Sequence, residues 1–130
     1  MENGTKVAED FAAGLRRRTK SFAFAVLKLC RGLPQTDEAR TIGRQLLRAR
    51  MSVGANYRAV TRARSKAEFI SKVSVVIEEA DESLFWLEAL SENGIVQRAK
   101  ADALLGEGDE LLRILVASQR TARKTRGRSS

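Results

Sequence analysis

The chain has 130 residues, of which 43% are hydrophobic and 31% are charged, and this size suits one compact domain without a second hydrophobic core. Lys and Arg outnumber Asp and Glu by 24 to 16, which gives a formal net charge of +8, and no His is present. The side chain that most often serves as a general base near neutral pH is therefore missing. The single Cys, Cys30, excludes an intramolecular disulfide and a Cys/His metal cage.

The start of the chain and its longest apolar run predict a soluble, cytoplasmic protein. Residues 1–4 lack the basic region followed by an apolar core that defines a secretory signal, so export is not expected. The longest uninterrupted apolar stretch, residues 22–27, is six residues long, whereas a membrane span needs about 20. A lone Cys also fits a reducing compartment.

The first two helices are predicted on either side of a break near Pro34. The first covers residues 6–31, because Pro34 disfavours helix at the residue before it. The second covers residues 37–61, because Thr36 or Asp37 can cap its N-terminus. The apolar stripe of the first helix has helical spacing and comprises Phe11, Leu15, Phe22, Val26, Leu29 and Leu33.

The third helix is predicted over residues 66–93. Ser65 and Glu68 form a capping box, in which the Ser side chain accepts an early backbone N–H and the Glu reaches back to the cap. Asn93 and Gly94 supply a left-handed stop. The predicted core seam alternates steps of four and three residues and comprises Phe69, Val73, Val76, Ala80, Ser83, Leu87 and Leu90.

A fourth helix over residues 95–120 completes the predicted fold. Gly106 and Gly108 weaken its middle by roughly 1 kcal/mol each relative to Ala. Four helices joined by tight connections predict an all-α, antiparallel, up-down-up-down four-helix bundle. Residues 121–130 contain several cations, no acid and no large apolar side chain, so a disordered basic tail is expected there.

A second apolar surface is indicated by helical projection. On the second helix, Leu47 and Met51 point away from the core seam, and on the third helix Trp86 does the same. In a monomer this Trp, Leu and Met would be exposed to solvent, and their exposure favours subunit contacts. The predicted subunit interface comprises Leu47, Met51, Val75, Glu79, Glu82 and Trp86.

Charge is segregated along the chain. Residues 36–66 hold eight basic and two acidic groups, whereas residues 78–110 hold ten acidic and two basic groups. Contact between these unlike faces in neighbouring subunits would be heterologous, and this geometry closes into rings.

The remaining cations gather on the first helix and near the C-terminus. Arg outnumbers Lys by seventeen to seven, and guanidinium groups suit phosphate recognition. RNA or DNA is therefore the leading partner, although ordinary solvation of a basic protein is the alternative interpretation. The predicted nucleic-acid-binding residues are Arg16, Arg17, Arg18, Lys20, Arg120, Arg123, Lys124, Arg126 and Arg128.

The sequence offers no pattern typical of catalysis, of a cofactor or of a metal site. The acids of residues 78–82 lack the His that carboxylate metal sites in helical bundles use. Gly106-Glu107-Gly108 lacks the Lys and the Ser or Thr of a phosphate loop. We therefore expect a protein without enzymatic activity and without a small-molecule substrate.

Several polar side chains beside the core of the second helix are expected to be structural. Arg48, Ser52 and Asn56 follow one another at single helical turns. We interpret them as an interhelical hydrogen-bond relay to Glu78 and Glu82 of the third helix, or to an adjacent subunit.

Three motifs resemble the bacterial four helix bundle protein family, first noticed as proteins encoded in intervening sequences of large-subunit ribosomal RNA genes. They are residues 45–57 (QLLRARMSVGANY), 65–72 (SKAEFISK) and 78–87 (EEADESLFWL). The resemblance covers roughly residues 20–120 and implies the bundle fold.

The resemblance also implies a homopentameric ring. The family is similar to the accessory variability protein of diversity-generating retroelements, a basic pentamer that binds nucleic acid and a reverse transcriptase. This chain departs from the family where many members carry an acid after the Asn of the first motif, because Arg58, Ala59 and Val60 stand there.

The sequence thus predicts a non-enzymatic, oligomeric bundle that binds RNA or DNA through a basic surface. The resemblance extends this to an accessory role beside a nucleic-acid-processing enzyme such as a reverse transcriptase. The alternative is a structural or protein-binding scaffold whose positive charge confers only solubility.

Overall fold

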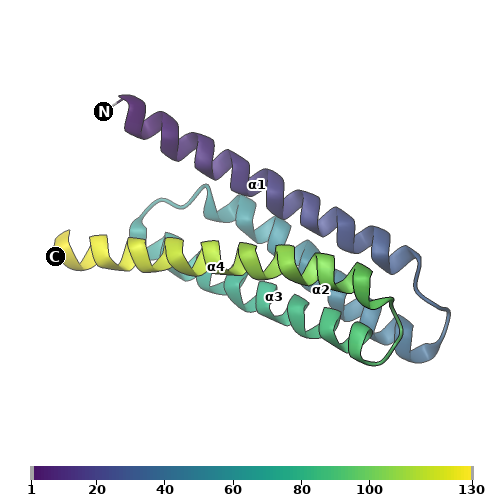
Figure 1. Ribbon diagram of the computed structural model, residues 1–130. Helices are drawn as coiled ribbons and strands as arrows, with labels where there is room; N and C mark the ends of the chain where they lie inside the picture. Colours follow the sequence, from purple (N-terminus) through teal and green to yellow (C-terminus); the bar gives the residue numbers. More distant parts are fainter. Residues whose placement is uncertain (1, 130) are drawn as a thin grey trace.

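The protein is a bundle of four antiparallel helices, as predicted. The computed structural model describes the backbone of residues 2–129 and the side chains of residues 10–124. Within the described backbone the regular elements are all helical, and consecutive helices run in opposite directions, which brings the two ends of the chain to the same end of the bundle (Figure 1). The elements are α1 (Glu2–Arg31), α2 (Asp37–Val60), α3 (Lys66–Glu92) and α4 (Arg98–Ser129).

Side-chain caps explain where α2 and α3 begin. The hydroxyl of Thr36 accepts from the Ala39 N–H at 3.2 Å, and the hydroxyl of Ser65 accepts from the Glu68 N–H at 3.1 Å. The Glu68 carboxylate accepts from the Arg64 N–H at 3.4 Å, and not from the Ser65 N–H that a capping box requires. Only the Ser65 half of the predicted capping box is therefore present at the start of α3.

The end of α3 is the turn that Asn93 and Gly94 predict. Gly94 has a φ of 68°, in the left-handed region that costs Gly little, so the chain can reverse there. The N–H groups of Ile95 and Val96 both donate to the Leu90 carbonyl, at 2.9 and 3.2 Å. These bonds satisfy the backbone between the helices, and α4 begins only at Arg98, later than the predicted residue 95.

The C-terminal prediction is wrong, because α4 continues through Ser129. Residues 121–126 contain neither Gly nor Pro, and their Arg and Lys side chains favour helix. Cations near a helix C-terminus are also stabilised by the helix dipole. Ala122 in this extension is half-buried. Ser130 lies outside the described residues.

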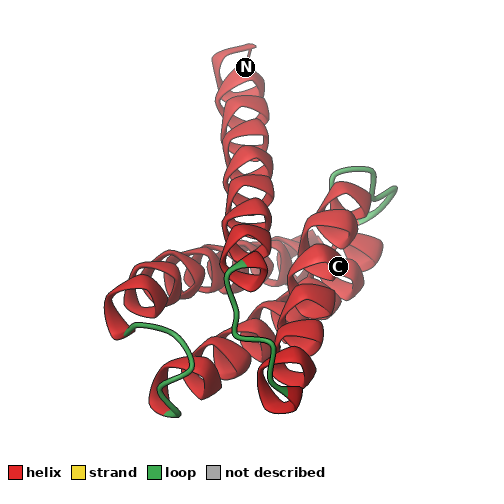
Figure 2. Ribbon diagram, turned by 90° about the vertical axis from the view of Figure 1, so that its right-hand side faces the viewer, coloured by secondary structure: helices red, strands yellow, loops and turns green. Residues whose placement is uncertain are grey.

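All four helices contribute to the core, and α1 covers it incompletely. Contacts of α3 with α2 and α4 are the most extensive, and those between α1 and α4 are the fewest. Figures 1 and 2 show α1 diverging from the other helices toward its N-terminus. Phe11 is consequently 56% exposed, although the predicted stripe placed it in the core. The fully buried core includes Val26, Leu46, Val53, Val73, Val76, Leu87, Leu90, Leu111 and Leu115.

No helix in the described part of the chain is both long and apolar enough to cross a membrane.

A buried cation lies where α1 crosses the bundle. Arg50 of α2 is 1% exposed, and its guanidinium carbon lies 3.7 Å from the centroid of the Phe22 ring. Burial lowers the pKa of Arg50 to about 9, and the negative charge of Glu107 opposes this lowering. Its Nε and Nη2 atoms have no hydrogen-bond partner. Arg50 was not predicted as a core residue, although its place four residues after Leu46 and three before Val53 puts it on the core side.

Gly108 of α4 makes room for this arrangement. A Cβ atom at residue 108 would lie 2.7 Å from Leu84 Cδ2 and 3.0 Å from Phe22 Cζ. The glycine that weakens α4 locally therefore lets Phe22 of α1 approach the α4 backbone closely.

Replacing Arg50 with Met tests the cost of the unpartnered cation. Arg50→Met removes both unsatisfied donors and keeps an unbranched chain beside Phe22, so the free energy of unfolding should rise by about 1–3 kcal/mol in urea denaturation. Arg50→Ala also removes the donors but leaves a cavity, so it should be less stable than Arg50→Met. A lower stability of Arg50→Met than of the native chain would contradict this account.

Candidate functional site

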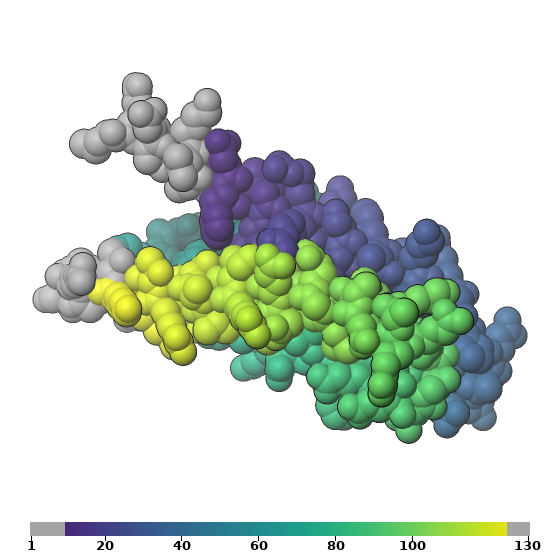
Figure 3. Space-filling view, viewed as in Figure 1, coloured from purple at the N-terminus to yellow at the C-terminus, as the bar shows by residue number. Residues whose placement is uncertain are grey.

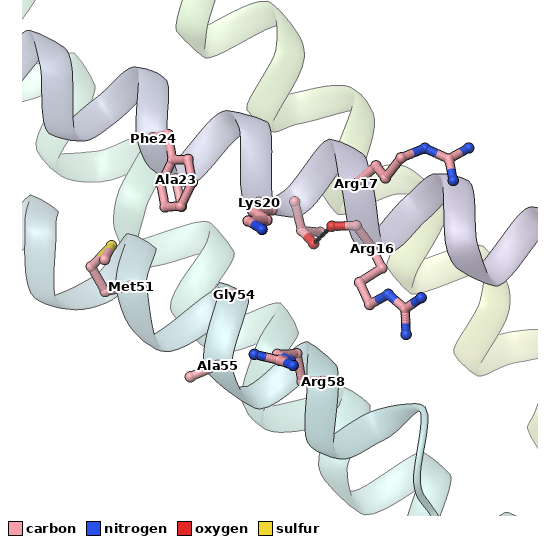
Figure 4. A pocket seen from close by; sticks show the side chains of 10 residues that line it. Arg16, Arg17, Lys20, Ala23, Phe24, Met51, Gly54, Ala55 and Arg58 are labelled. Atoms are coloured by element: carbon pink, nitrogen blue, oxygen red, sulfur yellow. Dashed lines mark hydrogen bonds between the residues drawn. The ribbon is translucent and has the colours of Figure 1, made fainter.

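A groove of about 600 Å³ lies between α1 and α2. Figure 4 shows its two walls, with α1 on one side and α2 on the other. Its lining combines charged side chains with small or apolar ones. The lining residues are Arg16, Arg17, Thr19, Lys20, Ala23 and Phe24 of α1, and Met51, Gly54, Ala55 and Arg58 of α2.

Helical spacing explains why these residues meet. Arg16, Lys20 and Phe24 follow one another at steps of four and therefore share one face of α1. Met51 and Arg58 are seven residues apart, which places them two turns apart on one face of α2. Small side chains at the crossing leave the space between the two faces open.

The groove is strongly cationic. Four of its lining residues are Arg or Lys, and no described lining residue is acidic. Among the residues whose side chains are described, Arg16, Arg17 and Arg58 form no ion pair, and Lys20 lies 5.7 Å from the centroid of the Phe24 ring. Arg16 extends from α1 toward α2, whereas Arg17 points away from α2 (Figure 4). The positive field of the groove is thus not cancelled locally.

Arg18, predicted with its neighbours, lies elsewhere. Its Nε and Nη2 atoms donate to Glu107 of α4 at 3.0–3.1 Å, and Nη2 lies 3.3 Å from a Glu110 oxygen. The hydrogen bond with Glu107 is the main cause of a raised pKa of Arg18. Arg18 therefore joins α1 to α4 and does not contribute to the groove.

The C-terminal cations form a separate group. Arg120, Arg123 and Lys124 are exposed on α4, which does not line the groove. Figure 3 shows the described C-terminal part of α4, in yellow, at the end of the molecule where the described part of α1, in purple, begins. The side chains of Arg126 and Arg128 lie outside the described residues.

The predicted polar residues occupy the outer surface of α2 and α3. The Arg48 guanidinium contacts Glu82 at 2.6 Å and Glu79 at 3.6 Å. Trp86 Nε1 donates to the same Glu82 oxygen at 3.2 Å. This cluster joins α2 to α3 within one chain.

The other predicted polar residues make shorter-range contacts or none. Asn56 Nδ2 donates to Ser52 Oγ at 3.0 Å within α2, so this pair does not reach α3. Glu78 is exposed, and no ion pair joins it to another described side chain. The predicted relay is therefore not continuous: Arg48 connects α2 to α3, whereas Ser52 and Asn56 hydrogen-bond to each other.

The apolar residues of the predicted interface lie on α2 and α3 and are exposed or half-buried. Met51 is 43% exposed, Val75 is 45% exposed, and Leu47 is half-buried. Phe85 is 59% exposed and packs edge-on against Trp86, with ring centroids 4.9 Å apart. Phe85 was not among the predicted interface residues, and its place beside Trp86 in the sequence was the available signal.

The groove contains residues that sequence reasoning did not assign to a site. Phe24 and Arg58 come from different helices, and no local motif links them. Met51 was assigned to a subunit interface and lines the groove as well.

Metal chemistry has no obvious place in the described part of the chain. No group of three or more His, Cys, Asp or Glu side chains there could hold a metal ion. Cys30 is half-buried, and burial raises the pKa of its thiol.

The fold and the groove define a basic, all-α four-helix bundle protein. Residues 15–117 match the family model of the 23S rRNA-intervening sequence protein, and the chain belongs to that family. A crystal structure of a protein with unknown function from the S23 ribosomal protein family of Bacteroides thetaiotaomicron VPI-5482 is similar. It is 27% identical, has a TM-score of 0.75, and the match covers 81% of this chain and 97% of that one. No curated protein matches the chain.

Acid should loosen the cluster around Glu82. The hydrogen bond from Trp86, followed by that from Arg48, lowers the pKa of Glu82 below its usual 4.5. Since the folded-state pKa is the lower one, the stabilisation is complete above pH 4.5 and disappears as pH falls through the lowered pKa. The fluorescence of Trp86, the only Trp, should therefore change in that acid range.

Glu82→Gln should abolish this fluorescence transition, because the amide does not titrate, while circular dichroism checks that the helices persist. An identical transition in Glu82→Gln would assign it to another acid.

Proposed function

We propose that this protein is a non-enzymatic nucleic-acid-binding bundle, and that the groove between α1 and α2 contacts phosphates. The observation that carries the proposal is the set of cations Arg16, Arg17, Lys20 and Arg58 around a groove whose described lining contains no acid. Guanidinium groups offer forked donors that match phosphate oxygens, and an Arg without a carboxylate partner has these donors available.

The distribution of charge also supports the groove as the phosphate-binding surface. Several acids of α3 and α4 engage cations outside the groove, through the Arg48 pairs with Glu79 and Glu82 and the Arg18 pair with Glu107. An anionic polymer approaching the molecule therefore meets uncompensated positive charge at the groove and compensated charge on these surfaces.

Self-association is the second part of the proposal. Val75 and Phe85 of α3 and Met51 of α2 are exposed apolar side chains, and Trp86 of α3 is half-buried beside Phe85. A heterologous contact through this surface closes into a ring, and we propose a homopentamer. Repetition of the groove around a ring would multiply weak phosphate contacts through effective concentration.

The remaining parts of the proposal concern partners. RNA or DNA and further copies of this chain are the proposed partners, in the cytoplasm, without a membrane or a small-molecule substrate. An accessory role beside a reverse transcriptase extends the same proposal. The family description links these proteins to 23S rRNA intervening sequences, which makes RNA the first nucleic acid to test.

Charge reversal in the groove should weaken RNA binding. In the double variant Arg16→Glu and Arg58→Glu, affinity for a mixed-sequence single-stranded RNA should fall at least tenfold in fluorescence anisotropy at about 50 mM salt. The slope of log affinity against log salt should also become shallower, by about 0.7 for each phosphate that the variant no longer neutralises.

The matched control is the double variant Arg31→Glu and Arg98→Glu. It changes net charge by the same amount at two exposed positions outside the groove. Equal losses of affinity in both double variants would indicate general attraction to a basic protein. No binding by the native chain would favour the scaffold alternative.

The oligomer should depend on the apolar surface of α3. Light scattering at micromolar concentration should give about five times the chain mass for the native protein, and a much smaller mass for Val75→Glu. Val75 is 45% exposed, so the substitution leaves the bundle core intact. A monomeric native protein, or an unchanged mass in both Val75→Glu and Trp86→Glu, would contradict the proposed interface.

A further inference from the structure

We infer that the groove between α1 and α2 binds single-stranded nucleic acid and that an unstacked base packs on the ring of Phe24. The inference rests on the proposed function and specifies its ligand. Phosphates would contact Arg16 and Arg58, and a base face would contact Phe24.

The exposure of Phe24 is the first observation. Phe22 and Val26, two residues to either side, are buried at 2% and 0% exposure, whereas Phe24 is 52% exposed. A two-residue step turns a helical side chain by about 200°, so burial of Phe22 against the bundle directs Phe24 outward. The ring is therefore presented to solvent by a rigid, packed helix.

The surroundings of Phe24 are the second observation, since a single exposed apolar residue needs no functional explanation. Its ring borders the groove with Met51 on the facing helix, and both side chains flank the same space in Figure 4. Lys20 lies over the ring at 5.7 Å. A flat apolar surface and phosphate-binding donors thus occur together, as in proteins that bind single strands.

The groove also has room for a base. Gly54 lies in the wall of α2, and a Cβ atom added there would meet no atom within 4 Å. An aromatic ligand can enter beside Gly54 without displacing the core.

Single strands suit this site better than duplexes. In a duplex both faces of each base are covered by neighbouring bases, so a ring at a groove wall cannot reach them. Arg16 and Phe24 are eight residues apart, or about 12 Å along the helix at 1.5 Å per residue. One nucleotide of a duplex strand rises by about 3.4 Å along the helix axis, so this separation spans more than one nucleotide.

The experiment compares Phe24→Leu with the native chain on two probes, a single-stranded oligo-dT of about twenty nucleotides and a mixed-sequence duplex of equal length. Affinity for oligo-dT should fall about tenfold, because stacking on an aromatic ring contributes about 1–3 kcal/mol per base. Duplex affinity should change less than about twofold. The salt slope should stay as in the native chain, since every phosphate-binding cation is kept.

The matched control is Phe11→Leu, which makes the same change at an exposed ring of the same helix outside the groove. It should bind oligo-dT like the native chain. A 2-aminopurine base placed within the oligo-dT should lose fluorescence on binding to the native chain and to Phe11→Leu, but much less on binding to Phe24→Leu at saturation.

A second variant tests the space without altering the ring. Gly54→Leu should fill the groove and weaken oligo-dT binding about tenfold, whereas Gly106→Leu makes the same change at an open helical position on α4 and should not.

The outcomes separate this inference from the proposed function. Native affinity in Phe24→Leu, with binding abolished in Arg16→Glu and Arg58→Glu, would overturn the stacking site and leave phosphate binding standing. Tighter binding of the duplex than of oligo-dT by the native chain would also overturn the stacking site. Absence of binding to either probe would remove the proposed function itself.

Discussion

The close approach of Phe22 to α4 sets the orientation of α1 and, through it, the candidate site. Gly108 lacks the Cβ that would lie 3.0 Å from the tip of the Phe22 ring, and Arg50 packs on that ring at 3.7 Å. A ring held between a backbone and a guanidinium fixes the rotation of α1 about its own axis. With that rotation fixed, Lys20 and Phe24 must face the groove. The exposure of this surface is therefore a consequence of core packing.

Glu107 of α4 interacts with two cations, Arg18 of α1 and Arg50 of α2. Glu107 accepts directly from Arg18, and it is also the charge that partly offsets the desolvation of Arg50. Arg18 lies at the surface, where a single ion pair contributes at most about 1 kcal/mol. Arg50 lies in the interior, where the cation is costly and its effect on the fold is larger. The Arg18 pair joins α1 to α4, which have the fewest contacts of any adjacent helices, and Arg50 joins α2 to Phe22 of α1.

Local sequence signals predicted most of the fold but little of the site. Helical spacing on the third segment located its core from Val73 to Leu90, and Ser65 marked its start, because both signals depend on residues close in sequence. The course of α1 away from the bundle was not predictable in this way, so Phe11 was wrongly placed in the core. Composition also misled at the C-terminus, where a run of cations that suggests disorder continues a helix.

The site escaped prediction because it depends on how two helices cross. Arg16 and Lys20 were recognised as cations of one helix, but Arg58 and Phe24 acquire a role only when α1 and α2 are side by side. Arg18 illustrates the converse, since three consecutive Arg residues point in different directions around a helix and only a structure shows which has a carboxylate partner. Runs of charge in a helical sequence thus overstate the size of any one surface.

The position of Met51 connects the two parts of the proposed function. It lines the groove, and it also lies on the second apolar surface predicted to join subunits. In a ring built through that surface, each groove borders a subunit contact, so assembly would change the solvent exposure of the groove wall that Met51 forms. Ligand binding and assembly that share a residue are thermodynamically linked, and each must alter the apparent affinity of the other. Met51 is thus the residue through which ring formation and nucleic-acid binding would influence each other.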